Sequence, residues 1–549
     1  MRSTMMDVPL TVASLMSYGT SAYGGQEVVT CTGDGTRRRT YAEIGRRAAR
    51  LANALRRLGV DGDQRVATFM WNNAEHLEAY LAVPSMGAVL HTLNIRLAAS
   101  QVGYIANHAE DHVIIADASL IPLLAEILPH TKTVRHVVVT GTGTGPGGEI
   151  PQAEALAGAD REVHRYEDLL AAESDGFAWP DVDERSAAAM CYTSGTTGNP
   201  KGVVYSHRSV YLHSMGPCLG NAFALSERDR VLPVVPMFHA NSWGFPYAAV
   251  MCGAQLILPD RHMQPGALVR LIESERATVA AGVPTIWQGV LVHVRAAGGD
   301  LSSLRVVIAG GSAVPHALMK NYEDEFGVAL VQAWGMTETS PLASVAHPPV
   351  GATGNEAWRY RDSAGRFICT VQGRLAGDGG AFLPLDGEAV GEIEVRGPWV
   401  TGAYYKDDDP QKFHDGWLRT GDVGSIDPGG FIRITDRSKD VIKSGGEWIS
   451  SMELENALMA HPDVLEAAVI GVPDDRWGER PFAAVVVRDG AEVTANQLRD
   501  HLSASVPRWQ LPERWAYISE VPKTSVGKFS KRKMREAYAL GEYKVIEVG

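Results

Sequence analysis

The chain has 549 residues, more than one hydrophobic core usually organises, so we expect two or more domains. Its 64 acidic and 51 basic residues give a net charge of −13, which argues against nucleic acid as the main partner. A content of 45% hydrophobic and 21% charged residues is typical of a globular protein and excludes a disordered or fibrous one.

The compartment is predicted from the cysteines and the apolar runs. The five cysteines are scattered and never spaced as CxxC, which fits a reducing compartment and indicates neither a disulfide framework nor a zinc site. The N-terminus carries only Arg2 as an early basic residue and is broken by Asp7 and Pro9, so we expect no signal peptide. The longest apolar run, 243–259, is too short for a membrane span. The default prediction is a cytoplasmic protein.

The first elements predict a doubly wound sheet. Residues 40–59 have the pattern of an amphipathic helix, with Thr40 and Glu43 as a capping box and Gly59 at its end. Its arginine-rich face is predicted to be solvated. There follow a strand, a helix and two strands at 66–70, 75–86, 113–116 and 137–139. This alternation indicates a parallel sheet, and the Gly/Thr-rich segment 141–150 is predicted to be a surface loop.

Residues 192–202, Tyr-Thr-Ser-Gly-Thr-Thr-Gly-Asn-Pro-Lys-Gly, lie between apolar strands predicted at 187–191 and 203–205. The glycines bring backbone N–H groups close to a ligand, the hydroxyls add donors, and Lys201 adds a positive charge. This combination suits a polyphosphate. The stretch lacks the Gly-Lys-Ser/Thr of a Walker A loop. A polar hairpin without a ligand is the alternative, but the length of the match favours the phosphate loop.

This stretch resembles the phosphate loop of the adenylate-forming enzymes, which include acyl-CoA synthetases, peptide-synthetase adenylation domains and luciferases. The resemblance recurs in order along nearly the whole chain. It implies an α/β fold with a large N-terminal domain of doubly wound sheets plus a small β-barrel, here residues 1–436. It further implies a smaller, mobile α+β C-terminal domain, here residues 437–549.

A strand predicted at 231–236 leads to Met-Phe-His-Ala-Asn-Ser-Trp at 237–243. His239 falls where the family carries a histidine beside the acyl carboxylate, so the resemblance implies that it donates a hydrogen bond to that group or controls access to it. Trp243 falls where a tryptophan gates the acyl tunnel of long-chain fatty acyl-CoA synthetases. From the residues alone, a lone histidine is more often structural and the tryptophan fills core.

A buried helix and a strand at 255–258 come next, then a helix at 265–276 and strands at 279–282 and 306–309. The last strand opens into Gly310-Gly311-Ser312, a turn that lets a ligand approach the backbone and that in the family lies against adenine and the acyl chain. A plain strand-to-helix connection is the alternative. The acyl pocket implied by the resemblance is His239, Trp243, Val283, Thr285, Gly310, Gly311 and Trp334.

The strand predicted at 328–333 ends in Trp-Gly-Met-Thr-Glu-Thr at 334–339. Family members commonly have tyrosine or phenylalanine where Trp334 stands, and the resemblance implies that this ring stacks on adenine. It also implies that Thr337 contacts the α-phosphate and that Glu338, with Thr193, coordinates Mg²⁺. A lone glutamate is otherwise usually a surface residue.

Short strands between 385 and 434, such as 391–397, predict the small β-barrel. By family match Asp422 binds both ribose hydroxyls, Arg437 contacts the ribose or a phosphate, and Lys439 is the hinge. The complete ATP/AMP set implied by the resemblance is Thr193, Ser194, Gly195, Thr196, Thr197, Lys201, Gly311, Ser312, Gln332, Ala333, Trp334, Gly335, Thr337, Glu338, Asp422, Arg437 and Lys528.

The C-terminal region is predicted as a helix at 451–460, strands at 464–471 and 481–487, a helix at 495–506 and a tail. Lys528 matches the adenylation lysine of the family, whereas Lys531, Arg532 and Lys533 are predicted to face solvent. The loop for the thioester step is matched by Lys443, Gly445, Gly446 and Trp448. The catalytic residues that the resemblance implies are Lys528, Glu338, His239, Thr193 and Lys201.

The resemblance implies an ATP- and Mg²⁺-dependent acyl-CoA synthetase that forms an acyl-adenylate and then a CoA thioester. Strings at 238–243, 444–451 and 509–512 resemble enzymes for medium- and long-chain fatty acids, and also ligases for short acids such as methylmercaptopropionate. No charged residue among the acyl-pocket candidates matches a second charge, which disfavours dicarboxylic and amino acids. A carrier-protein-loading enzyme and a catalytically silent binding protein remain alternatives. The resemblance also implies a homodimer and allows peripheral membrane contact.

Overall fold

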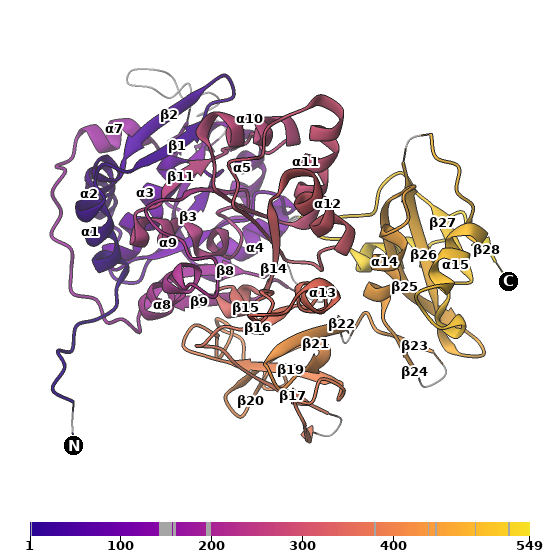
Figure 1. Cartoon of the computed structure of the whole chain (residues 1–549). Coiled ribbons are helices and arrows are strands. Elements are labelled where there is room, and N and C mark those ends of the chain that lie inside the picture. The colour runs from indigo at the N-terminus through magenta and orange to yellow at the C-terminus, as the bar shows by residue number, and fades with distance from the viewer. Residues whose placement is uncertain are drawn as a thin grey trace.

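A computed structural model of the chain describes residues 1, 3–141, 156–157, 161–193, 199–377, 380–437, 439–444, 447–488, 490–524 and 527–548. A large body holds the N-terminal three quarters of the chain, and a smaller C-terminal unit stands beside it (Figure 1). Among the described helices, none is long and apolar enough to cross a membrane. The predicted surface loop at 141–150 falls, beyond Gly141, outside the described residues.

One sheet of the large body has seven strands in the order β7-β6-β5-β3-β4-β8-β9, parallel except for the pair β8–β9. The strands are β3 Arg65–Phe69, β4 Val89–Thr92, β5 Asp111–Asp117, β6 His136–Thr140, β7 Glu162–Arg165, β8 Ala187–Tyr192 and β9 Gly202–Ser206. The accompanying helices are α2 Tyr41–Arg57, α3 Ala74–Ser85, α4 Ala99–Ala109, α5 Ile121–Ile127, α7 Tyr166–Ala171 and α8 His207–Cys218. The capping box of Thr40 and Glu43 is confirmed.

The second sheet has fifteen strands, and its middle is parallel. That middle consists of β1 Glu27–Cys31, β10 Arg230–Pro233, β11 Gln255–Leu258, β12 Val279–Gly282, β13 Val306–Gly310 and β14 Ala329–Gly335, with β2 Thr36–Thr40 antiparallel at one edge. Its helices are α1 Val12–Ala22, α9 Phe245–Cys252, α10 Pro265–Glu275, α11 Pro284–Ala297 and α12 His316–Phe326. The doubly wound α/β architecture predicted from the alternating elements is therefore confirmed.

The strands expected to form a small barrel continue this second sheet. They run antiparallel in the order β15-β16-β22-β21-β19-β17-β18, and among the described residues their hydrogen bonds do not close a ring. Their bounds are β15 Leu342–Val345, β16 Gly365–Phe367, β17 Gln372–Ala376, β18 Phe382–Leu383, β19 Gly391–Arg396, β20 Phe413–His414, β21 Trp417–Ile426 and β22 Phe431–Arg437, with α13 Gly354–Arg361 before β16. These strands continue the second sheet because β15 pairs with β14 and β16 pairs with β22. The pairing of β15 with β16 joins the two regions.

The arginine-rich face of α2 is only partly solvated, so that prediction was too simple. Arg47 Nε lies 2.7 Å from Oε1 of Glu78, a carboxylate that is fully buried, and its Nη2 lies 2.7 Å from Glu167. Because an unpaired carboxylate in the core is costly, the arginine is drawn inward to neutralise it. Arg46, next along the helix, is exposed.

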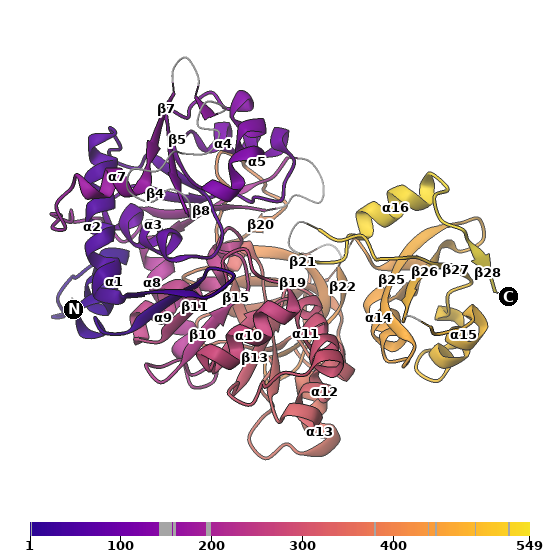
Figure 2. The ribbon, with the colours of Figure 1, turned by 90° about the horizontal axis from the view of Figure 1, so that it is seen from above.

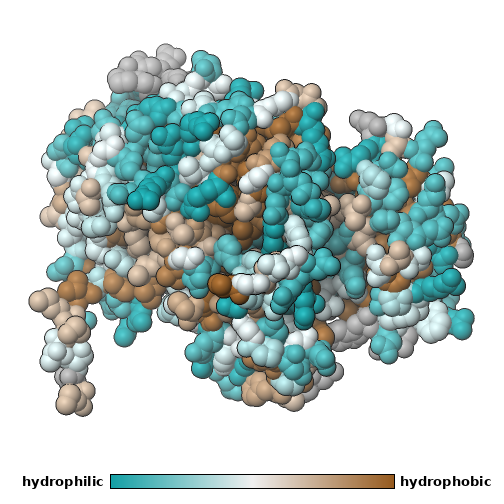
Figure 3. All heavy atoms as spheres, in the orientation of Figure 1, coloured by the Kyte–Doolittle hydropathy of each residue, from teal (hydrophilic) through white to brown (hydrophobic). Residues whose placement is uncertain are grey.

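The C-terminal unit has a six-stranded sheet and its own two hydrophobic clusters. The strands are β23 Ile442–Ser444, β24 Glu447–Ile449, β25 Val464–Asp474, β26 Gly478–Val487, β27 Arg514–Tyr517 and β28 Ile546–Glu547, with helices α14 Ser451–Met459, α15 Ala495–Ser503 and α16 Lys531–Ala539. The predicted tail thus contains β27, α16 and β28. The outward side of this unit is mostly hydrophilic (Figure 3).

Lys531, at the start of α16, does not face solvent as predicted. Its Nζ lies 2.6 Å from Ser451 Oγ and 2.9 Å from Glu455 Oε1, and the side chains of Lys531 and Glu455 are only 11% and 9% exposed. Ser451 Oγ in turn donates to the carboxylate of Asp436, at the end of β22. A buried ion pair therefore ties α16 to α14, next to the strand that leaves the large body.

Replacing Lys531 by alanine is expected to destabilise the C-terminal unit by about 3 kcal/mol, because Glu455 would keep a buried charge without a partner. Thermal unfolding and hydrogen exchange of α14 and α16 measure the loss. The matched control is Lys533→Ala, an exposed lysine on the same helix, which should change stability little. Equal effects of the two substitutions would contradict the assignment.

Candidate active site

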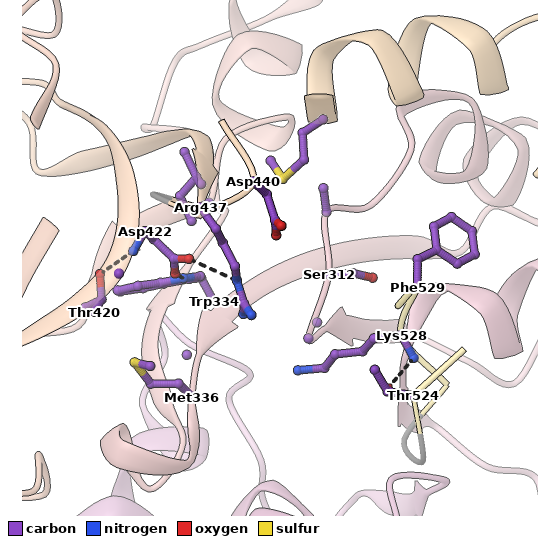
Figure 4. A pocket seen from close by; sticks show the side chains of 18 of the residues that line it. Ser312, Trp334, Met336, Thr420, Asp422, Arg437, Asp440, Thr524, Lys528 and Phe529 are labelled. Carbon is purple, nitrogen blue, oxygen red and sulfur yellow. Dashed lines mark hydrogen bonds and ion pairs between the residues drawn. The ribbon is translucent and has the colours of Figure 1, made fainter. Parts of the chain in front are cut away.

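A cleft of about 1730 Å³ lies where the large body meets the C-terminal unit. Figure 2 shows the two parts from above, and Figure 4 shows side chains from both of them around the cleft. Residues after the carboxyl ends of parallel strands line one wall, as open α/β sheets favour. They include Arg96 after β4, Thr193 after β8, Gly311 after β13 and Trp334 in β14. The other wall comes from α14, α16 and the residues just before α16.

The edges of the predicted phosphate loop line the cleft. The backbone N–H of Thr193 donates to the carbonyl of Lys201 at 2.9 Å, which closes the base of the loop. Ser194, Gly195, Thr196 and Thr197 lie outside the described residues. Lys201 Nζ lies 2.8 Å from Asp409 and 3.1 Å from Asp407, and the hydrogen bond to Asp409 raises the pKa of Lys201. The sequence did not indicate that this charge would be balanced by two aspartates.

Glu338 is 6% exposed, so it is not the surface residue that a lone glutamate suggests. It lies in a short turn after β14, and the hydroxyl of Tyr404 donates to its Oε1 at 2.7 Å. The neighbouring carbonyl of Thr337 accepts from Tyr205 at 2.8 Å. These contacts hold a carboxylate in a fixed orientation at the cleft wall.

Trp334, Asp422 and Arg437 form a connected group (Figure 4). Trp334 Nε1 donates to Asp422 Oδ2 at 2.8 Å, and Arg437 Nε lies 3.3 Å from Oδ1. Asp422 in β21 pairs directly with Arg437 in β22, so the sheet register sets this contact. The side chain of Gln332 makes two hydrogen bonds within the protein. Its Oε1 accepts from the Val314 backbone N–H and its Nε2 donates to the Ser363 carbonyl, each at 2.7 Å. Ala333, Gly335, Thr337 and Ser312 line the cleft as well.

Lys528 extends into the cleft from a turn in which Thr524 accepts the Lys528 backbone N–H at 3.2 Å. Burial and the charge of Arg437 lower the pKa of Lys528 to about 8, although Asp422 and Glu338 oppose that shift. The lysine stem lies against Gly311, whose φ is +86°. A Cβ on that glycine would stand 2.9 Å from Lys528 Cε. Glycine suits this position because of its positive φ, and a Cβ here would require the end of the Lys528 side chain to shift.

His239 lies at the cleft wall as expected. Burial lowers its pKa to about 3, and the positive charges of Lys528 and Arg96 act in the same direction. The imidazole is therefore neutral at physiological pH, with one N–H to donate.

Trp243 lies on a strained turn. Residues 240–243 have φ values from 41° to 54°, a left-handed stretch that ordinary residues avoid. The turn is held by Ser242, whose Oγ donates to the carbonyl of Val235 at 2.7 Å. The far end of the Trp243 ring lies 3.4 Å from the position a Cβ would take on Gly310. The residues that line the cleft include four with apolar side chains, namely Phe223, Trp243, Phe245 and Ile308.

The acyl-pocket candidates Val283 and Thr285 lie beside the turn that carries Lys528. Val283 Cγ1 is 3.5 Å from the position that a Cβ would take on the cleft residue Gly311, and Thr285 Oγ1 donates to the carbonyl of Gly527 at 3.4 Å. Both residues stand at the start of α11, and the turn that carries Lys528 packs against this end of the helix. Arg96, which the sequence did not suggest, lies in the cleft and faces the ring of Phe238 at 5.9 Å. Arg96 is a positive charge in the cleft that the argument against acids with a second charge did not include.

The predicted hinge residue Lys439 lines the cleft, and burial lowers its pKa to about 8. Arg535 of α16 donates to the Lys439 carbonyl at 3.3 Å and to Asp440 at 2.7 Å. Lys443, on β23, is exposed and does not line the cleft. Gly445, Gly446 and the side chain of Trp448 lie outside the described part of the chain.

The comparisons with known proteins agree with this geometry. Residues 20–405 match the family of AMP-binding enzymes, and residues 453–528 match the AMP-binding enzyme C-terminal domain. The chain is 43% identical to the 3-methylmercaptopropionyl-CoA ligase of Ruegeria pomeroyi over 98% of this chain and 99% of that protein. It is 44% identical to the long-chain-fatty-acid–CoA ligase of Thermus thermophilus over 98% and 97%. The crystal structure of the anthranilate CoA ligase AuaEII in complex with anthranoyl-AMP gives a TM-score of 0.86 at 25% identity, covering 98% of this chain and 99% of that one.

The chain therefore belongs to the AMP-binding enzymes, the adenylate-forming family. Within that family it is an ATP-dependent, AMP-forming acyl-CoA ligase, whose substrates are a carboxylic acid, ATP and CoA.

Gly311→Ala is expected to lower acyl-CoA formation at least tenfold, because the new methyl group displaces Lys528 from the cleft. The matched control is Gly327→Ala, at a φ of +68° with nothing within 4 Å of the new Cβ. Both variants carry the backbone strain, about 1 kcal/mol, but only the first disturbs the lysine. A steady-state assay of AMP release separates them; similar losses in both would mean that strain alone explains the effect.

Proposed function

We propose that the protein activates a medium- or long-chain fatty acid in this cleft, first as an acyl-adenylate and then as acyl-CoA. The carrying observation is the position of Lys528. A lysine from the C-terminal unit reaches the same cleft as Glu338, Asp422 and the phosphate-loop edge of the large body. In this proposal its charge lies between the carboxylate and the α-phosphate as they approach each other.

The residues of the first step divide between the two substrates. In this proposal Lys528 bridges the carboxylate and the α-phosphate, where negative charge builds up as they join. His239, being neutral, donates a hydrogen bond to the carboxylate. Asp422 binds the ribose hydroxyls with the lone pairs that Trp334 and Arg437 leave available, and the face of Trp334 stacks on adenine.

The donors present suit Mg²⁺. The oriented carboxylate of Glu338 and the hydroxyl of Thr193 are hard oxygen ligands in one cleft, and such ligands with phosphate oxygens are what this ion prefers. When bound, Mg²⁺ would supply positive charge to the phosphates. The hydrogen bond from Tyr404 would hold the Glu338 carboxylate in place for that ion.

The second step, in this proposal, requires the C-terminal unit, residues 437–549, to turn about Lys439 relative to residues 1–436. That motion would withdraw Lys528 and bring in the loop of Lys443, Gly445, Gly446 and Trp448. Besides the contacts of Lys528 with Gly311 and of Gly527 with Thr285, it would break two contacts beside the hinge. Ser451 N–H donates to Asp436 at 2.7 Å, and Ser450 Oγ donates to the carbonyl of Thr435. Asp436 stays with the large sheet, paired with Val423.

A fatty acid is favoured by the apolar side chains Phe223, Trp243, Phe245 and Ile308 and by the identity to the Thermus thermophilus enzyme. The second candidate substrate is methylmercaptopropionate, a short acid. It is favoured by the 43% identity to the Ruegeria pomeroyi enzyme.

A panel of acids decides between these candidates. With ATP, Mg²⁺ and CoA, we expect kcat/KM to rise with chain length by about tenfold for every one to two buried methylenes until the pocket is filled. Trp243→Ala should move that optimum to longer acids. Highest activity with methylmercaptopropionate and a steady fall with chain length would reject the fatty acid.

Lys528→Ala is expected to lower adenylation by roughly 10²–10³-fold, as loss of other preorganised charge stabilisers does. Conversion of supplied acyl-AMP and CoA to thioester should be nearly unchanged, because that step proceeds with Lys528 withdrawn. Pyrophosphate exchange and a single-turnover thioester assay measure the two steps. Equal loss in both would contradict the two-arrangement proposal.

The pKa of Lys528, about 8, also predicts a pH dependence. The lysine is charged below that value and neutral above it, so kcat/KM for adenylation should fall as pH rises through about 8. Lys528→Arg, which keeps its charge, should remove this limb even if its rate is lower. Lys439 has a similar pKa, so Lys439→Gln is the control and should retain the limb. A limb that persists in Lys528→Arg belongs to another group.

A further inference from the structure

Imidazole and carboxylate groups lie close together at one edge of the seven-stranded sheet. None of them has a role in the proposed mechanism. His136 Nδ1 lies 3.1 Å from His164 Nε2. A carboxylate oxygen of Glu162 lies 3.5 Å from the same atom of His164 and 3.8 Å from His136 Nδ1. His112, on the next strand, packs its ring edge-on against His136 at 5.6 Å.

The strand register explains this meeting. β6 and β7 are parallel, with His136 opposite Glu162, and His164 lies two residues beyond Glu162 on the same face. His136 and Glu162 are the first residues of β6 and β7, and His164 is the third of the four residues of β7. The cleft residues Arg96 and Thr193 follow the carboxyl ends of β4 and β8 in the same sheet. His136 and Glu162 are therefore at the opposite end of their strands from the end that contributes to the cleft, and Figure 2 shows β5 and β7 far from the C-terminal unit.

We propose that His136, Glu162 and His164 form a binding site for Zn²⁺ or another divalent transition-metal ion. Three donor atoms separated by 3.1, 3.5 and 3.8 Å define a point that is about 2.0 Å from each of them. Zinc binds imidazole nitrogen and carboxylate oxygen at about 2.0–2.2 Å. Two imidazoles and one carboxylate leave a fourth position, which water can fill because Glu162 is 71% exposed.

The charge state of the site fits a metal. Burial lowers the pKa of His136 and of His164, so both imidazoles are neutral and have lone pairs at physiological pH. The Leu58 carbonyl lies against the rings of His136 and His112, and a carbonyl beside a ligating ring commonly accepts its second N–H. Arg57 and Arg135 oppose a cation nearby, but Arg57 is paired with Glu173 at 3.0 Å.

A bound metal ion would stabilise the pairing of the edge strand β7 with β6. β7 is the last strand of its sheet and pairs only with β6 among the described strands. Two of the ligands come from β7 and one from β6, so a bound ion joins them side chain to side chain. In the metal-free state the close His136–His164 contact has one ring donating an N–H to the other. For both facing nitrogens to bind the ion, the donating imidazole must carry its proton on its other ring nitrogen instead, and the ring stays neutral.

The test uses the full-length protein without a histidine tag. Isothermal titration with Zn²⁺ and the visible absorption of added Co²⁺ should show one ion per chain, bound with micromolar or tighter affinity. Millimolar Mg²⁺ should not compete, because imidazole is a poor ligand for it. His164→Ala should weaken binding at least tenfold. Glu162→Gln, at an exposed position that folding does not need, should weaken it several-fold.

His414→Ala is the matched control. His414 is a surface histidine with one carboxylate, Asp415, at 3.6 Å, and its replacement should leave binding unchanged. Acyl-CoA formation with Mg²⁺ and ATP should stay within twofold for Glu162→Gln. The proposal is overturned if the wild type binds no more Zn²⁺ than the double variant His136→Ala/His164→Ala, or if His414→Ala loses as much as His164→Ala. If Glu162→Gln lost acyl-CoA formation in proportion to its loss of Zn²⁺ binding, the proposal that the metal site is separate from the cleft would be overturned.

Discussion

One contact between the two parts of the chain determines the rest of the site: the Lys528 side chain against Gly311. The glycine has a backbone conformation that ordinary side chains avoid, and a Cβ there would require the end of the Lys528 side chain to shift. The lysine's charge is thereby held in a cleft that also contains Arg437, Asp422 and Glu338. Burial, together with the charge of Arg437, disfavours the charged ammonium group and lowers the pKa of Lys528. Negatively charged substrates bound in the cleft would favour the charged form of Lys528.

The groups around this lysine are fixed by contacts on the large body. Trp334 and Arg437 hold Asp422, Tyr404 holds Glu338, and Asp407 with Asp409 hold Lys201. Side chains set in this way need little reorganisation when charge develops, which is how enzymes obtain most of their electrostatic stabilisation. On the side of the C-terminal unit, Lys531 and Glu455 anchor α16 to α14 beside Asp436. The orientation of Lys528 thus depends on a polar cluster close to the hinge.

The seven-stranded sheet has chemically active side chains at both edges. Its carboxyl edge contributes to the cleft, as expected for a parallel sheet. Away from the cleft, the pairing of β6 with β7 brings His136 Nδ1 and His164 Nε2 to within 3.1 Å of each other. Cysteine spacing gave no indication of a metal site, because the ligands proposed here are histidines 28 residues apart on neighbouring strands. Only strand pairing brings them together.

The sequence alone determined the family, the α/β class and most of the elements of the large body, because local signals set them. The Thr40–Glu43 capping box and the phosphate-loop string are complete within a few residues. The tertiary structure decided what depends on distant contacts. It drew Lys531 and Arg47 inward to buried carboxylates, placed Arg96 in the cleft and turned Val283 and Thr285 toward the Lys528 turn. Charge pairing and sheet register act across tens to hundreds of residues, and no local pattern records them.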